Sequence, residues 1–240
     1  MIVLSRSGRL GVALLVLVAV VGIGVGARPS PVWQVLSTVT GVKRLLPIYS
    51  VDTPEKKVSL SFDACWGADK TEELLRVLEQ YQVKTTFFLV NIWLDKYPDL
   101  ARKIAQAGHE IGLHSTTHPS FPSLSEEAME RELVENAALI RQVTGYEPVL
   151  FRPPFGAYDN RVITVAEKLG FKTIQWSIDS LDWKDLTADQ MFERITKRAR
   201  PGAIVLMHNN GKHTAEVLPR LLEWFLQEGY RVVPISELLL

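Results

Sequence analysis

The stretch Val58-Ser-Leu-Ser-Phe-Asp63 is an apolar strand that ends on a carboxylate, and the alternation that it begins decides the fold. From Lys57 onward, strand-like runs alternate with helical runs whose apolar residues recur every three or four positions. Seven strands are predicted, at 58–63, 84–90, 110–114, 149–152, 171–178, 203–208 and 230–234. Six helices are predicted between them, at 70–80, 99–107, from 123 to about 145, at 159–169, from 187 onward, and at 215–227.

Two of these helices open on capping-box patterns, Ser123 with Glu126 and Thr187 with Gln190. Strict alternation requires parallel strands joined by right-handed crossovers. Seven strands, some as apolar as Ile204-Val205-Leu206, favour a closed or nearly closed barrel, with an open doubly wound sheet as the alternative.

Polar residues stand at the carboxyl ends of five predicted strands: Asp63, His114, Arg152, Asp179 and His208. In a β/α barrel these ends surround one mouth, where active sites lie, whereas an open sheet would spread them along an edge. The sequence therefore predicts a barrel with one site at its mouth.

The spacing of two histidines suggests a metal site. His114 ends a strand and His118 follows it just before Pro119, so both imidazoles can face one point. We interpret them as ligands of zinc or another borderline divalent ion. Two polar surface histidines are the alternative, because H-x-x-x-H in a loop is weak evidence by itself.

Asp63 and Arg152 are interpreted as a pair. Asp63 is a candidate general base for an attacking water, with a helix or loop cap as the alternative. Arg152 precedes Pro153-Pro154, which fix an extended backbone, and it is expected to orient Asp63 through a bidentate contact. A salt bridge that only braces the barrel would use the same contact.

His208 is the candidate general acid, and Asp182 is the carboxylate expected to raise its pKa. Trp183 offers a flat apolar face for a sugar ring, with simple packing as the alternative. Leu206, on the strand of His208, is a further candidate substrate-binding residue.

The first 27 residues predict a signal peptide or a membrane anchor. Arg6 and Arg9 precede Leu10–Ala27, an uncharged run of 18 residues without proline. The positive-inside bias places the rest of the chain, and therefore the catalytic domain, outside the cytoplasm, either membrane-anchored or secreted. Residues 28–56 are expected to form a stalk or linker, although Ile48–Val51 could instead be an edge strand of the domain at 57–240.

The composition limits the classes of partner. With 240 residues, of which 47% are hydrophobic, the chain can bury the core of one ordinary domain. Its 27 basic and 27 acidic residues cancel, so no nucleic-acid partner is expected. The single cysteine, Cys65, excludes an internal disulfide framework.

Five segments in order, around Asp63, His114–His118, Arg152–Gly156, Asp179–Trp183 and Leu206–His208, resemble the NodB-type polysaccharide deacetylases of carbohydrate esterase family 4. The resemblance covers about 57–240 and is greatest to the sporulation-associated branch. It implies a distorted (β/α)7 barrel that removes N-acetyl groups from peptidoglycan or chitin-like sugars with a divalent metal, usually zinc, with cobalt or nickel as alternatives.

The same resemblance implies roles for individual residues. Asp63 would be the base and His208 the acid, while Arg152 orients the base and Asp182 tunes the acid. His114 and His118 would hold the metal. The backbone N–H of Phe155 would help to bind the oxyanion at the substrate.

One position departs from the family pattern, which has a second aspartate, a metal ligand, where this chain has Ala64. A methyl group cannot ligate a metal, so an extra water, Asp63 or Cys65 would have to compensate. Cys65 is more often a small buried residue.

Two main functions remain open. The first is an N-deacetylase of cell-wall polysaccharide. The second is a glycan-binding cell-wall protein whose chemistry is weakened or lost because of Ala64. Hydrolysis of a small amide is a third possibility, because a fold does not dictate its substrate.

Overall fold

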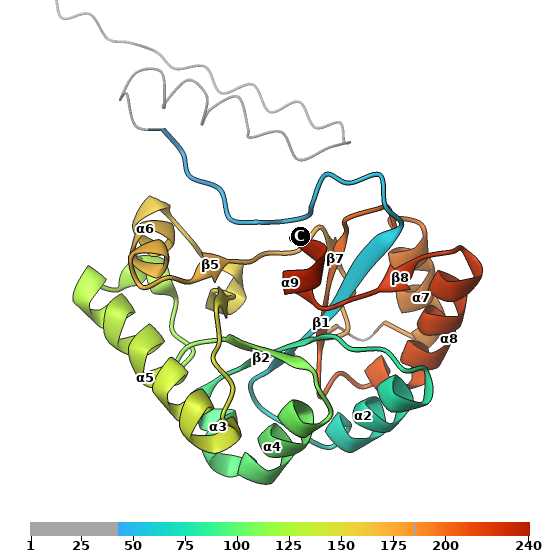
Figure 1. Ribbon diagram of the computed structural model, residues 1–240, viewed down its shortest axis with the longest axis horizontal. Helices are drawn as coiled ribbons and strands as arrows, with labels where there is room; N and C mark the ends of the chain where they lie inside the picture. Colours follow the sequence, from blue (N-terminus) through green and yellow to red (C-terminus); the bar gives the residue numbers. More distant parts are fainter. Residues whose placement is uncertain (1–42, 185) are drawn as a thin grey trace, which may run out of the picture. The chain divides into compact units, whose positions relative to one another are not determined.

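A curved sheet of parallel strands forms the centre of the protein, and helices cover its outer face (Figure 1). The computed structural model describes residues 43–184 and 186–240. The strands are β1 (Lys57–Ala64), β2 (Thr86–Leu89), β3 (Glu110–Leu113), β4 (Leu150–Phe151), β5 (Lys172–Thr173), β6 (Ile178–Asp179), β7 (Ile204–His208) and β8 (Arg231–Val232). Their order is β5-β4-β3-β2-β1-β7-β6, and β8 pairs with β1. Every pairing between these named strands is parallel.

The helices pack on this sheet through a large apolar core. They are α2 (Thr71–Gln80), α3 (Asn91–Lys96), α4 (Pro98–Gln106), α5 (Glu126–Thr144), α6 (Asn160–Lys168), α7 (Ala188–Thr196), α8 (Thr214–Gln227) and α9 (Ile235–Leu238), with 3-10 turns η1 (Phe121–Ser123) and η2 (Pro154–Gly156). A smaller cluster of apolar side chains fills the other face of the sheet. The distorted β/α barrel that the alternation predicts is therefore confirmed.

The barrel is open at one seam, where the prediction of a single strand at 171–178 is wrong. That stretch forms β5 and β6, which are the two edges of the sheet and pair with β4 and β7 respectively. The backbone changes partners between them, because Gln175 donates to the carbonyl oxygen of Ile48 and Ser177 to that of Ile204. The carboxyl ends of all the strands still face one mouth.

Helix ends follow local chemistry. The predicted capping box Thr187–Gln190 is confirmed at the start of α7. The one predicted at Ser123 is wrong, because Ser123 lies in η1 and the side chain of Ser125 caps α5. Gly145 ends α5 with a φ of 71°, a left-handed conformation that glycine adopts without steric cost.

Alternation along β1 positions the site. Val58, Leu60 and Phe62 are fully buried in the core beneath the helices. Ser61 and Asp63 point to the opposite face, into the barrel, because successive side chains of a strand alternate. The last polar residue of β1 therefore faces the interior at the mouth.

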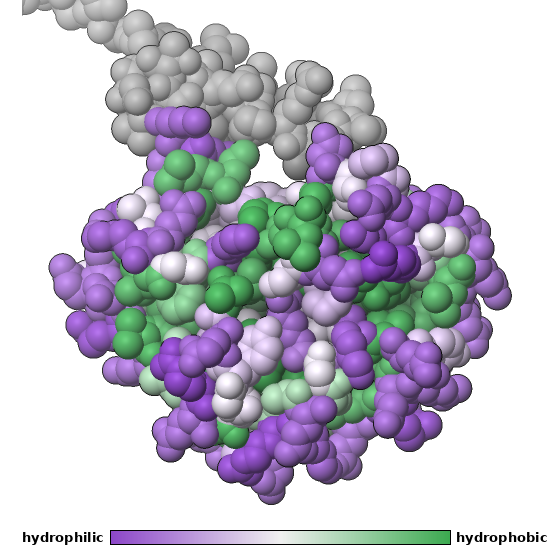
Figure 2. Space-filling view, in the orientation of Figure 1, coloured by the Kyte–Doolittle hydropathy of each residue, from purple (hydrophilic) through white to green (hydrophobic). Residues whose placement is uncertain are grey.

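Residues 44–56, drawn in blue in Figure 1, lie against the sheet. Ile48 and Ser50 form isolated bridges to Ile174 and Ala203, and the compact unit begins at Arg44. These contacts agree with the alternative that places Ile48–Val51 at a sheet edge. In Figure 2, apolar groups gather near this segment and near α9, while hydrophilic side chains cover the surrounding helices.

The predicted signal or anchor at 1–27 lies outside the described residues. Among the helices of residues 43–184 and 186–240, none has the length and hydrophobicity of a bilayer-spanning segment.

His109, before β3, is expected to make stability depend on pH. Burial, and then the charge of Lys84, lower the pKa of this imidazole to about 4, from about 6.5 in an unfolded chain. As the pH falls from 6.5 towards 4, His109 binds a proton in the unfolded chain but stays neutral in the folded protein. The free energy of unfolding therefore decreases by up to about 3 kcal/mol. Urea unfolding at several pH values measures this loss. A His109→Gln variant should lose correspondingly less than the wild type, and equal losses would contradict the assignment.

Candidate active site

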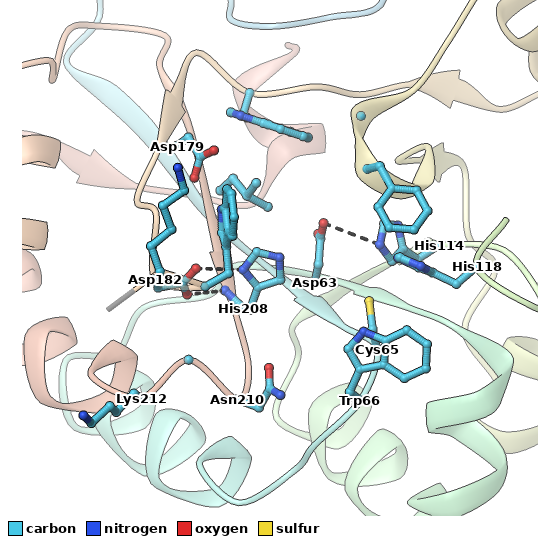
Figure 3. A pocket seen from close by; sticks show the side chains of 17 residues that line it. Asp63, Cys65, Trp66, His114, His118, Asp179, Asp182, His208, Asn210 and Lys212 are labelled. Carbon is cyan, nitrogen blue, oxygen red and sulfur yellow. Dashed lines mark hydrogen bonds and ion pairs between the residues drawn. The ribbon is translucent and has the colours of Figure 1, made fainter. Parts of the chain in front are cut away.

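A pocket of about 750 Å³ lies at the carboxyl ends of the strands. Eight of the nine residues predicted for the site line it: Asp63, His114, His118, Phe155, Asp182, Trp183, Leu206 and His208. Arg152, the ninth, is fully buried behind Asp63. Figure 3 shows Asp182 and His208 on one side of Asp63 and His114, His118 and Cys65 on the other. The structure thus brings the predicted residues together at one mouth.

Asp63 is held by a buried arginine. Nη1 of Arg152 donates to Oδ1 of Asp63 at 2.7 Å, and its Nη2 donates to Oγ of Ser61 at 2.8 Å. The expected bidentate contact is therefore not formed, because the second nitrogen is used by Ser61. The guanidinium also lies over the ring of Phe88, 4.1 Å from its centre. Gly112 leaves room for this ring, because a Cβ at residue 112 would lie 2.5 Å from it.

This contact keeps Asp63 ionised although the residue is only 4% exposed. Burial alone would raise the pKa of its carboxyl, but the charge of Arg152, the neighbouring histidines and the hydrogen bond from Arg152 together outweigh burial and hold the pKa below its usual value. Oδ2 of Asp63 is left facing the pocket, 3.6 Å from Nε2 of His114. A buried carboxylate with one free oxygen can accept a proton.

His208 is held by Asp182 on the other side of the pocket. Nδ1 of His208 lies 2.7 Å from Oδ1 of Asp182, while Oδ2 accepts from the backbone N–H of His208 and from Oγ1 of Thr214. Burial would lower the pKa of His208, but the hydrogen bond and charge of Asp182 outweigh it and raise that pKa. Gly211 leaves room for this pair, because a Cβ there would lie 2.8 Å from Oδ2 of Asp182. The expected carboxylate–imidazole partnership is therefore present.

Asp63 and His208 are neighbours across the β1–β7 pairing. Their side chains point to the same face, on strands about 4.8 Å apart. A proton acceptor, Asp63, and a proton donor, His208, therefore lie next to each other in the same pocket.

His114 and His118 lie side by side at the opposite wall, with ring centres 5.0 Å apart. Nδ1 of His114 lies 2.8 Å from the carbonyl oxygen of Arg152, which leaves Nε2 for the pocket. Burial lowers the pKa of both rings, that of His118 to about 4, so both are neutral and able to ligate a metal.

Together with Cys65, the two imidazoles offer three donor atoms that lie within 4.8 Å of one another, a grouping found within residues 43–184 and 186–240. Nδ1 of His118 is buried and has no hydrogen-bond partner among the described residues. A buried nitrogen without a partner and a set of imidazole and sulfur donors fit a borderline divalent ion.

Asn136 of α5 fixes the loop that carries the histidines, and sequence reasoning did not predict it. Its Oδ1 accepts from the backbone N–H groups of His114 and Ser115, at 2.9 and 3.0 Å. Its Nδ2 donates to the carbonyl of Leu89 and to Oδ1 of Asn91. All four hydrogen bonds of this fully buried amide are satisfied, so it ties the ends of β2 and β3 together.

Glu132, one turn earlier on α5, holds the rest of the loop. Its Oε2 accepts from the backbone N–H groups of Thr116 and Thr117, both at 2.8 Å. Ser115 and His118 have positive φ values of 79° and 59°, a conformation that is costly for residues other than glycine. The hydrogen bonds to α5 keep His118 in this conformation and aimed at the pocket.

Aromatic side chains form the rim of the pocket. Phe155, Trp66 and Trp183 are 71%, 60% and 59% exposed, and the first two lie edge-on to His118. Trp183 carries Lys184 over its face, with Nζ 4.7 Å from the ring centre. Leu206 is buried in the floor. Exposed aromatic faces around a polar pocket suit sugar rings.

A β/α barrel with a buried carboxylate, a carboxylate-backed histidine and metal donors at one mouth has the groups that metal-assisted hydrolases use. Residues 50–174 match the family model described as polysaccharide deacetylase. The chain belongs to the polysaccharide deacetylase family, which implies a divalent metal at the site.

Two curated relatives and one solved structure illustrate the similarity. The chain is 35% identical over 203 residues to the peptidoglycan-N-acetylglucosamine deacetylase PgdA of Listeria monocytogenes, covering 82% of this chain and 43% of that protein. It is 31% identical over 196 residues to a peptidoglycan-N-acetylglucosamine deacetylase of Bacillus cereus, covering 80% of this chain and 92% of that protein. A crystal structure of a pseudoenzyme of carbohydrate esterase family 4 from Bacillus anthracis matches with a TM-score of 0.78 at 34% identity, covering 81% of this chain and 69% of that chain.

The lengths of these proteins differ. The chain spans 60% and 43% of the length of two curated relatives, one from Bacillus subtilis and the Listeria enzyme.

Proposed function

We propose that the protein is a metal-dependent hydrolase that removes N-acetyl groups from a cell-wall polysaccharide, with peptidoglycan as the favoured polymer. The observation that carries this proposal is the pairing, across one pocket, of Asp63 held ionised by Arg152 with His208 backed by Asp182. The peptidoglycan deacetylases among its relatives support the choice of substrate.

Asp63 and His208 carry the two proton transfers. As a water attacks the acetamide carbonyl, Asp63 accepts its proton while Arg152 keeps the carboxylate in place. When the carbon–nitrogen bond breaks, His208 donates its proton to the departing amine, and Asp182 stabilises the imidazolium beforehand. The products are acetate and a free amino sugar, so one water is consumed for each bond broken.

His114 and His118 are the residues that would hold the metal, and zinc is the ion that two imidazoles at this mouth suit best. When bound, it would supply Lewis-acid activation of the carbonyl and of the attacking water. The aromatic rim of Phe155 and Trp183 would bind the sugar, with the N–H of Phe155 directed at the developing oxyanion. Phe155 has a positive φ of 60°, and this backbone conformation orients the peptide groups around it.

The site of action is part of the proposal. Residues 1–27 would export the protein as a signal or anchor it in the membrane, and residues after them would act on the wall outside the cytoplasm. A role in sporulation is proposed on the resemblance alone.

Acetate release by the purified full-length chain tests the activity. Peptidoglycan and chitooligosaccharides are incubated with added zinc, cobalt or nickel, and acetate is measured. We expect metal-dependent release that disappears in His114→Ala and persists in His213→Ala. His213 is the matched control, because its imidazole contacts Glu216 and does not line the pocket.

The second candidate is a glycan-binding protein whose chemistry has been lost. Ala64 favours it, because this fully buried methyl group stands where the family pattern has a metal-binding aspartate. The Bacillus anthracis relative is described as a pseudoenzyme, and a mutant of it as having restored enzymatic activity. Glycan binding without acetate release under any added metal would establish this candidate and overturn the first.

A further inference from the structure

Cys65 is placed to replace the ligand that Ala64 cannot provide. Its Sγ and one nitrogen each of His114 and His118 lie within 4.8 Å of one another, and Figure 3 shows the sulfur pointing towards the two imidazoles. We propose that Cys65 is the third protein ligand of the metal ion held by His114 and His118. The inference rests on the proposed function only for the presence of an ion at this site.

Cys65 is the first residue after β1 and lies in the bend that follows the strand. Asp63 and Cys65 both line the pocket, whereas Ala64 between them does not. A donor at 65 therefore reaches the pocket from the position next to Ala64.

The spacing of the three donors requires little adjustment. A tetrahedral zinc ion with bonds of about 2.0–2.3 Å needs its ligand atoms about 3.3–3.8 Å apart. The donor atoms are at most 4.8 Å apart, so a side-chain rotation that moves the sulfur or one nitrogen by about 1 Å brings them to these distances. His114 is already fixed by its hydrogen bond to the carbonyl of Arg152, and the buried Nδ1 of His118 has no partner in the described part of the chain.

The chemistry of the set is also consistent with a catalytic ion. Two neutral imidazoles and one thiolate carry a single negative charge, as two imidazoles and one carboxylate would. Thiolate and imidazole both suit zinc, whereas magnesium and calcium prefer oxygen ligands. Three protein ligands would leave a fourth position open for water, and the carboxylate of Asp63 lies 3.6 Å from Nε2 of His114.

Cobalt substitution tests the proposal on the full-length chain, with cobalt alone as the probe. Cys65 is the single cysteine of the sequence, so a thiolate-to-cobalt charge-transfer band in the near ultraviolet can come from no other residue. We expect the band in the wild type and in His213→Ala, and no band in Cys65→Ala. Zinc affinity should fall at least about 100-fold in Cys65→Ala, because even partners outside the ligand set change affinity 10–100-fold.

A cobalt complex without the thiolate band, or a folded Cys65→Ala variant that binds zinc as tightly as the wild type, would overturn the proposal. Alkylation of the wild-type thiol gives a readout that needs no variant: zinc should protect Cys65, and equal rates with and without zinc would contradict ligation. Acetate release separates the two proposals. Metal-dependent acetate release without a thiolate-to-cobalt band would contradict only the assignment of Cys65 as a ligand. A thiolate-to-cobalt band without acetate release would contradict only the proposed deacetylase activity.

Discussion

Arg152→Met is expected to lower the free energy of unfolding by about 3–5 kcal/mol at neutral pH, because breaking a buried ion pair leaves a charge without its partner. Arg152 is fully buried, and its guanidinium donates to Asp63 and Ser61 at 2.7 and 2.8 Å. Methionine keeps much of the apolar contact with Phe88 but neither hydrogen bond. Urea unfolding followed by tryptophan fluorescence measures the loss.

The pH dependence of that loss identifies its cause. In the wild type, Arg152 holds the pKa of Asp63 below its usual value, so the pair stabilises the fold above pH ~4 and this contribution disappears on acidification. In Arg152→Met, burial acts without the guanidinium, the pKa of Asp63 rises, and the carboxyl becomes neutral at higher pH. The difference between wild type and variant should therefore shrink as the pH falls.

A second substitution provides the control. Asp63→Asn in the Arg152→Met background removes the unpaired charge, so the double variant should recover most of the lost stability. A loss that persists unchanged in the double variant would show that Arg152 acts through packing on Phe88 and not through Asp63.

The order of strands and helices could be predicted because apolar residues recur at a different spacing in each kind of element, every second residue in strands and every three or four residues in helices. The stripe Met129, Leu133, Ala137 and Ile140 is buried along α5 as expected. Helix α3 was not predicted, because it has six residues and its N-cap, Val90, has no side chain that could bond the helix start. The seam between β5 and β6 was also missed, since it depends on bonds from Gln175 to Ile48, which lie far apart in the sequence.

The site could be predicted where polar residues end strands, since a barrel gathers strand ends at one mouth. Its supports could not, because Glu132 and Asn136 act from a helix with no motif of their own. One signal was available: Asn136 falls on the apolar stripe of α5, three residues after Leu133 and four before Ile140. A polar residue on a buried stripe must find hydrogen-bond partners, which here are the backbone groups around His114.

Asp63→Asn is expected to lower the rate of acetate release by about 10²–10⁴-fold, the contribution typical of a general base. The amide keeps the shape of the side chain and an oxygen for the hydrogen bond from Arg152, but it cannot take a proton from water. Rates are compared per folded protein, because Arg152 loses its counter-ion in this variant. Asp189→Asn is the matched control, since Asp189 forms a surface ion pair with Arg220 and does not line the pocket.

The pH profile then separates the base from the acid. Activity should need ionised Asp63, whose pKa lies below its usual value, and protonated His208, whose pKa Asp182 raises. The wild-type rate should therefore fall on the alkaline side as His208 loses its proton. In Asp182→Asn the carboxylate charge is gone, so the pKa of His208 drops and the alkaline limb moves to lower pH. An alkaline limb that stays in place in Asp182→Asn would show that His208 is not the acid, and an Asp63→Asn variant as active as the wild type would remove Asp63 from the mechanism.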